Sequence, residues 1–255
     1  DDTASYSEDC GASDTIVHIP DANFKAYLVG NTQINTNGDS EIQVIEAEAF
    51  NGGIYVEYGD ISDLTGMEAF KKLTVLDCNN INLTSLDVSQ NTLLTSLSCY
   101  ANELTSLDIS QNTELTELDC SNNNLTSLDF SENTSLTYLS CGSNQLTSLD
   151  VSENTALTYL SCGLNQLTSL DVSENTLLTE LWCGGNELTS LDISENLELE
   201  DLGCYENQLT SLNLKNGNNA NITSMMAYEN ENLTCILVDD ESAKNTSCDS
   251  KNKQG

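Results

Sequence analysis

Hydrophobic and polar positions repeat with a period of 21 residues through most of the chain. The period that spans 94–114 has two similar halves, and each half holds three apolar positions. The last two apolar residues of each half flank one polar residue, which is the period-two pattern of a half-buried strand. Each period is therefore predicted to contribute two short parallel strands, with these side chains turned inward: Leu94, Leu97, Cys99, Leu104, Leu107 and Ile109.

A cysteine marks the same position in seven consecutive periods: Cys78, Cys99, Cys120, Cys141, Cys162, Cys183 and Cys204. A fixed period in this range indicates a solenoid, in which each unit is stable only when it is stacked on its neighbours. The cysteines belong to an inward apolar column, where a thiol behaves as a small hydrophobic group. A linear column does not bring ligands to one point, so no metal site is predicted there.

Asparagine recurs after each predicted strand. A buried turn leaves backbone groups without partners, and an amide side chain carries both a donor and an acceptor for them. We expect both columns to satisfy the turns, the first through Asn102, Asn123, Asn144, Asn165, Asn186, Asn207 and Asn230, and the second through Asn91, Asn112, Asn133, Asn154, Asn175 and Asn196.

The string Leu-x-x-Leu-x-Cys-x-x-Asn-x-Leu resembles the leucine-rich repeat consensus, with Cys in the third apolar position. The nested half, Leu-x-x-Leu-Asp-x-x-x-Asn, resembles the 21-residue bacterial subclass called IRREKO repeats. The resemblance covers about residues 61–232. It implies a leucine-rich repeat solenoid, right-handed and mostly β, of roughly eight coils. It also implies a binding role, commonly on extracellular bacterial proteins, and no catalytic residues.

The flanking segments are predicted to be a disordered acidic tail over 1–14, a helical N-terminal cap over 15–60, and a C-terminal cap and tail over 233–255. In the N-terminal cap, a helix is expected over 21–30, with Asp21 as its N-cap. Cys235 and Cys248 can close a small loop through a disulfide, which would suit an oxidising compartment. Cys10 is left without an assigned partner.

Residues 35–46 resemble an EF-hand loop, with oxygen-bearing side chains at loop positions 1, 3 and 5, an apolar residue at 8 and a glutamate at 12. Two positions depart from that pattern, because position 1 is Asn rather than Asp and position 6 is Ser40 rather than Gly. The alternative is an Asn/Gly/Asp turn that needs no metal. The resemblance implies a structural calcium ion held by Asn35, Asn37, Asp39, Glu41 and Glu46.

The chain carries 41 acidic residues against seven lysines and no arginine, for a formal net charge of −34. Such a surface repels phosphate backbones and anionic headgroups, which argues against nucleic acid and membrane partners. No apolar run approaches the ~18 residues of a spanning helix. The chain has one histidine and no arginine, so it lacks most of the residue types that a His-based triad or an Arg-clamped phosphate site requires. We therefore predict that it is not an enzyme. The chain starts at Asp1 rather than Met, and we expect a processed, secreted or cell-surface protein.

Ligand binding is expected where the repeat varies, since packing explains its constant columns. Tyr138, Tyr159 and Trp182 fall at outward positions of three successive periods. Clustered exposed aromatic side chains are typical of a recognition surface. The candidate ligand-binding residues are Tyr100, Tyr138, Tyr159, Trp182, Tyr205, Glu117, Asp119 and Glu180.

Several ligands suit this surface. A protein partner follows from the family resemblance, whereas aromatic planes beside carboxylates and hydroxyls also suit the rings of a glycan, with or without calcium. Two alternatives involve no ligand at this surface. In one, the aromatic side chains only stack on one another across strands. In the other, the chain is a spacer or an adhesin stalk.

One aspartate recurs in the second half of each repeat, and these aspartates form a column. Neighbouring carboxylates there repel one another by ~1 kcal/mol in water at about 5 Å. We expect each carboxylate to accept hydrogen bonds from nearby Ser, Thr or backbone groups, with cation binding as the alternative, along Asp87, Asp108, Asp129, Asp150, Asp171 and Asp192.

Overall fold

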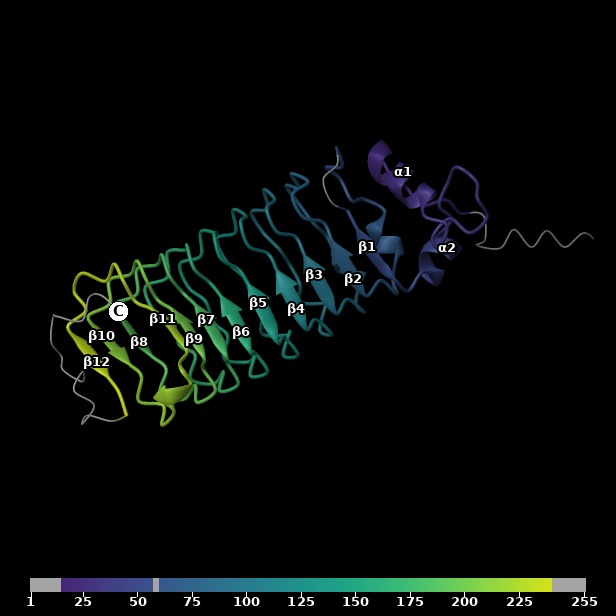
Figure 1. Cartoon of the computed structure of the whole chain (residues 1–255). Coiled ribbons are helices and arrows are strands. Elements are labelled where there is room, and N and C mark those ends of the chain that lie inside the picture. Colours follow the sequence, from purple (N-terminus) through teal and green to yellow (C-terminus); the bar gives the residue numbers. More distant parts are fainter. Residues whose placement is uncertain (1–14, 57–59, 240–255) are drawn as a thin grey trace, which may run out of the picture.

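The computed structural model describes residues 15–56 and 60–239, which form an elongated solenoid with two helices at its N-terminal end (Figure 1). The helices are α1, Ala22–Gly30, and α2, Val44–Ala49. Asp21 caps α1 as predicted, because its Oδ1 accepts hydrogen bonds from the backbone N–H groups of Asn23 and Phe24 at 2.9 and 3.0 Å. The predicted acidic tail over 1–14, the residues after 239, and both Cys10 and Cys248 lie outside the described residues.

Parallel strands of three residues stack into one nine-stranded sheet, which we call the main sheet (Figure 1). Eight of its strands lie within 61–232, and the first lies in the segment assigned to the N-terminal cap. The strands are β1 (Gly53–Tyr55), β2 (Val75–Asp77), β3 (Ser96–Ser98), β4 (Glu117–Asp119), β5 (Tyr138–Ser140), β6 (Tyr159–Ser161), β7 (Glu180–Trp182), β9 (Asp201–Gly203) and β11 (Ser224–Met226).

The register of the main sheet places equivalent residues of successive coils side by side. Leu97 pairs with Leu118, and that residue pairs in turn with Leu139. All three leucines are buried, with at most 1% of their surface exposed. A column in the repeat alignment is therefore a row on the molecule, as the 21-residue period predicts.

The second half of the repeat forms a ladder only near the C-terminal end, where β8 (Ser190–Asp192), β10 (Ser211–Asn213) and β12 (Cys235–Leu237) pair in a three-stranded parallel sheet. The prediction of two strands in every coil is therefore wrong for the earlier coils. In the second half of the repeat, each earlier coil forms one backbone hydrogen bond with the next coil, such as Gln145 N–H to Leu125 O at 2.8 Å. The later coils add bonds such as Thr210 N–H to Thr189 O at 2.9 Å, and this closer pairing completes the ladder.

The core is one continuous column of apolar side chains that runs from the N-terminal cap through the solenoid. The seven cysteines of the repeat are free thiols and fully buried. Cys235 is disulfide-bonded. Short 3₁₀ turns at Met67–Ala69 and Asn219–Asn221 lead into and out of the regular coils. Within the described residues, no helix combines the length and the apolar character needed to cross a membrane.

The two asparagine columns behave differently. In the first, Asn144 donates to the carbonyls of Cys120 and Cys141 at 3.1 Å, and its Oδ1 accepts from the backbone N–H of Leu125 at 3.0 Å. In the second, the side-chain amide of Asn154 donates to the carbonyls of Phe130 and Asn133, at 3.0 and 2.9 Å. Its Oδ1 is buried without a partner, and the same holds for Asn91, Asn112, Asn133, Asn175 and Asn196. The expectation that both columns use donor and acceptor is correct only for the first.

Candidate functional site

Tyr138 and Tyr159 form the centre of the outward surface of the main sheet. They are register partners on β5 and β6, and their rings stack with centroids 4.4 Å apart and an interplanar angle of 7°. Burial first, and then the neighbouring Tyr159 and Asp119, together raise the pKa of Tyr138 to about 12. The hydroxyl therefore stays protonated at neutral pH and can donate a hydrogen bond.

The indole of Trp182 lies against the next coil. A Cβ added to its register partner Gly203 would come within 2.4 Å of the indole Cε3, so the missing side chain makes room for the ring. The indole N–H donates to Glu180 Oε2 at 3.2 Å within the same strand. These contacts fix the orientation of a half-buried aromatic ring.

A second tyrosine pair lies beyond Trp182. The rings of Tyr205 and Tyr228 stack with centroids 5.0 Å apart. A Cβ on Gly184 would lie 2.7 to 2.8 Å from the ring of Tyr205, which shows that this ring faces Gly184. Tyr228 is absent from the predicted ligand-binding residues, although it occupies the same alignment column as Tyr205.

Tyr100 stands apart from these groups. Its own column continues through small residues before it reaches Tyr205, namely Ser121, Gly142, Gly163 and Gly184. Its ring is 44% exposed. The structure therefore brings together four of the five predicted aromatic residues along neighbouring coils, and Tyr100 lies two coils before Tyr138.

The three predicted acidic residues flank the tyrosine stack. Glu117 pairs in register with Tyr138 on one side, and Glu180 pairs with Tyr159 on the other, so the row reads Glu, Tyr, Tyr, Glu. Asp119 lies on the same strand as Glu117 and accepts a hydrogen bond from the backbone N–H of Ser121 at 3.0 Å. Asp201, which is not among the predicted ligand-binding residues, extends the row beyond Glu180. We call these residues, with the two tyrosines and Trp182, the aromatic-acidic face.

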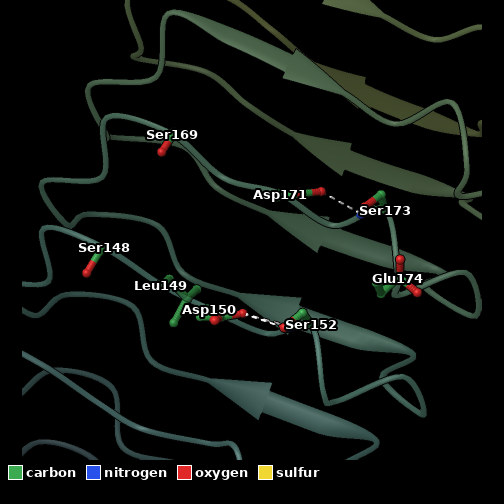
Figure 2. A pocket seen from close by; sticks show the side chains of 8 residues that line it. All are labelled: Ser148, Leu149, Asp150, Ser152, Ser169, Asp171, Ser173 and Glu174. Carbon is green, nitrogen blue, oxygen red and sulfur yellow. Dashed lines mark hydrogen bonds between the residues drawn. The ribbon is translucent and has the colours of Figure 1, made fainter.

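The aspartate column lies on the opposite half of the coil. Asp150 and Asp171 line a pocket of about 200 Å³ together with serines and Glu174, as Figure 2 shows. Each aspartate accepts a hydrogen bond at 3.0 Å from the backbone N–H of the serine two residues later, Ser152 or Ser173. These bonds lower the pKa of both carboxyls. The hydrogen bonds predicted for the aspartate column are thus confirmed, and cation binding stays an alternative.

In the loop that resembles an EF-hand, Glu46 is held by hydrogen-bond donors of the chain. Its Oε1 accepts from the backbone N–H and the hydroxyl of Thr36 and from the N–H of Asn37, at 2.7, 2.9 and 3.1 Å. Its Oε2 accepts from the backbone N–H of Gln43 at 3.1 Å, which forms a capping box at the start of α2. Burial raises the pKa of Glu46, but these hydrogen bonds outweigh it and the net pKa is lowered.

The other predicted metal ligands are also engaged. The Asn35 amide donates to Val29 O and Asp39 O, and Asn37 donates to Asp39 Oδ2 at 3.0 Å. Glu41 pairs with Lys25 at 2.6 Å. Across residues 15–56 and 60–239, no three His, Cys, Asp or Glu side chains converge as a metal site would require. A calcium ion here would have to replace several of these hydrogen bonds, and its binding remains a prediction.

Known proteins share this arrangement of stacked coils. Residues 113–154 match the family described as Leucine Rich repeats (2 copies). Internalin C2 from Listeria monocytogenes superimposes with a TM-score of 0.68 at 19% identity, over 89% of this chain and 98% of that one. The chain has the leucine-rich repeat fold. A leucine-rich repeat protein of Leptospira interrogans gives a TM-score of 0.65 at 23% identity, over 78% of this chain.

The leucine-rich repeat solenoid is also similar to the functional domain of InlJ from Listeria monocytogenes, which is described as including a cysteine ladder. The identity is 31% and the TM-score 0.59, over 86% of this chain. This chain spans 59% of the length of the InlJ and Leptospira structures. Among curated protein sequences, none matches it.

Proposed function

We propose that this chain is a non-catalytic binding protein that recognises a protein partner through its aromatic-acidic face. One observation carries the proposal: two stacked tyrosines, a fixed tryptophan and four flanking carboxylates occupy adjacent strands of one sheet. Aromatic residues are enriched among the side chains that dominate binding energy at protein interfaces. A sheet surface that is already ordered loses little conformational entropy when a partner binds.

The fold supports this proposal. Solenoids offer extended surfaces built from equivalent positions of successive repeats, and the variable positions can change without disturbing the core. Here the constant columns are the buried leucines, cysteines and asparagines, whereas Tyr138, Tyr159 and Trp182 are changes at outward positions. The similarity to InlJ and internalin C2 points to the same class of solenoid.

We infer a secreted or cell-surface location from two features. Cys235 is disulfide-bonded, and disulfides persist in oxidising compartments. The formal net charge of −34 favours solubility and disfavours contact with anionic lipids. Labelling of intact cells with an antibody against the solenoid, compared with labelling after lysis, would test this location.

The test of function is selection of binders from a displayed library of random peptides, with a glycan array run in parallel. Trp182→Ala and Tyr159→Ala should each weaken binding of the selected peptides, whereas Leu177→Ala, at an exposed position outside the strands of the main sheet, should not. Sugar hits that Trp182→Ala abolishes would favour the glycan alternative. Failure to find any ligand in either screen would overturn the proposal in favour of a spacer.

A further inference from the structure

The row Glu117, Tyr138, Tyr159, Glu180 concentrates negative potential on one strip of the main sheet. The two rings stack on each other, so the outer face of each ring is turned toward the coil that carries a glutamate. Successive coils are ~4.8 Å apart, so the two glutamates lie on the coils that border the tyrosine stack. Their carboxylates accept hydrogen bonds from Ser96 on β3 and from Trp182 on β7. The face of an aromatic ring carries negative charge density and attracts a cation within about 6 Å.

The residues that the structure describes place no positive charge on this strip. The three outward columns of the main sheet contain no lysine, and the chain has no arginine. The ion pairs Lys25–Glu41 and Lys71–Glu48 lie in the N-terminal cap and the first coil. Glu117 and Glu180 accept hydrogen bonds from neutral donors, the hydroxyl of Ser96 and the indole N–H of Trp182, each at 3.2 Å.

Small residues lie beside the tyrosines. On β5 and β6 the tyrosine is followed by a serine in the next outward column, and the column after the cysteine holds Gly142, Gly163 and Gly184 on three successive coils. A Cβ at Gly163 would lie 2.8 Å from the carbonyl oxygen of Gly184, and one at Gly184 would lie 2.7 Å from the Tyr205 ring, so these glycines let neighbouring coils pack closely. The serines therefore leave the two tyrosines as the large side chains of this stretch.

We propose that the aromatic-acidic face binds a basic protein segment, whose lysine or arginine side chains cross the Tyr138–Tyr159 stack. Their positive ends lie toward Glu117 and Asp119 at one side, or toward Glu180 and Asp201 at the other. The methylene groups of these side chains contact the ring edges, while the charge pairs with the carboxylates and the ring faces. This inference rests on the proposed function and names the chemistry of the partner.

The probes are short peptides of alternating glycine with arginine, glutamine or glutamate, and binding is measured by titration calorimetry at physiological salt. The arginine peptide is expected to bind at least about tenfold more tightly than the glutamine peptide, since several charge pairs and cation–π contacts add. The glutamate peptide is expected not to bind. Equal affinities for the arginine and glutamine peptides would overturn the inference.

Matched variants distinguish the effect of the charges on the face from the effect of the overall negative charge. Glu117→Gln with Glu180→Gln removes two charges from the face, and Glu132→Gln with Glu153→Gln removes two charges from exposed turns elsewhere. The first pair of substitutions should lower the affinity for the arginine peptide about tenfold. The second pair should lower it by less than about twofold. Tyr138→Leu with Tyr159→Leu, which preserves all charges, should also weaken it. Equal losses for both glutamine pairs would show diffuse attraction and overturn the inference.

The two proposals can fail separately. If displayed peptides bind the face but basic peptides hold no advantage, the partner is not basic and protein recognition stands. If no displayed peptide binds, protein recognition itself is wrong. Circular dichroism melting of every variant distinguishes loss of binding from loss of fold.

Discussion

Trp182 occupies space that exists because residue 203 is glycine: a Cβ there would lie 2.4 Å from the indole. The two residues are register partners on β7 and β9, so one coil shapes the binding side chain of its neighbour. A substitution in one coil of the solenoid can therefore change the conformation of a side chain in the neighbouring coil.

Gly203→Ala is expected to displace the indole and to shift the tryptophan emission to longer wavelength, because the ring becomes more exposed to water. Trp182 is the only tryptophan in the chain, so the fluorescence reports this site alone. Gly30→Ala is the matched control, since a Cβ at Gly30 meets nothing within 4 Å. An unchanged emission spectrum in Gly203→Ala would contradict the close contact between the two coils.

Substitution of the two asparagine columns should have unequal effects. Asn144→Ala removes two close carbonyl contacts and leaves the buried N–H of Leu125 without an acceptor, whereas Asn154→Ala removes two donated bonds and a buried oxygen that lacks a partner. We expect a loss of about 3 kcal/mol in the free energy of unfolding for the first and about 1 kcal/mol for the second. Urea denaturation measures both, and equal losses would show that the orphaned oxygen has no energetic weight.

The cysteine column should be chemically inert while the protein is folded. Burial, together with the nearby Asp119 carboxylate, raises the pKa of Cys99 and Cys141 to about 12, so the reactive thiolate is scarce at pH 8. Iodoacetamide followed by intact mass measurement should therefore label the seven column thiols only after denaturation. Cys141→Ala should lower that count by one. Labelling of the column in the folded protein would contradict its burial.

Glu46 should contribute stability that depends on pH. Glu46→Gln places an amide N–H₂ against N–H donors, and we expect a loss of about 2 kcal/mol at pH 7. The folded pKa of Glu46 lies below its ordinary value of 4.5. The stability gap between the two proteins is therefore full above pH 4.5 and closes as the pH falls through the lowered pKa. Glu153→Gln, an exposed position, is the control for the general effect of one charge.

Calcium binding by the loop over 35–46 is tested by melting the protein with EDTA and again with added calcium. If calcium replaces the hydrogen bonds to Glu46, the melting temperature should fall in EDTA and rise with the ion. Asp39→Asn, which removes a predicted ligand charge, should diminish the rise. Identical melting curves would leave the loop as a hydrogen-bonded cap that needs no metal.

Much of the fold could be predicted from the repeat, because its period fixes which side chains share a column. The inward set around Leu97, Cys99 and Leu104, the parallel strands of the main sheet and the N-cap at Asp21 all follow local patterns. The second ladder could not be predicted in this way. Nearly identical Leu-Thr-Ser-Leu segments are strands at β8 and β10 and irregular in earlier coils. The difference lies in backbone hydrogen bonds such as Thr210 N–H to Thr189 O, which form only in the later coils and which the local pattern does not encode.

The repeat pattern alone specifies which leucine, cysteine and asparagine residues are buried and which outward positions vary. The arrangement of the variable side chains is visible only in the folded structure. It showed that Tyr138 and Tyr159 stack between two glutamates, that Gly203 makes room for Trp182, and that the Glu46 carboxylate is satisfied by N–H and O–H groups of its own loop. The reason is physical. A periodic pattern encodes which residues are neighbours, whereas the orientation of a ring or a carboxylate depends on the atoms that surround it.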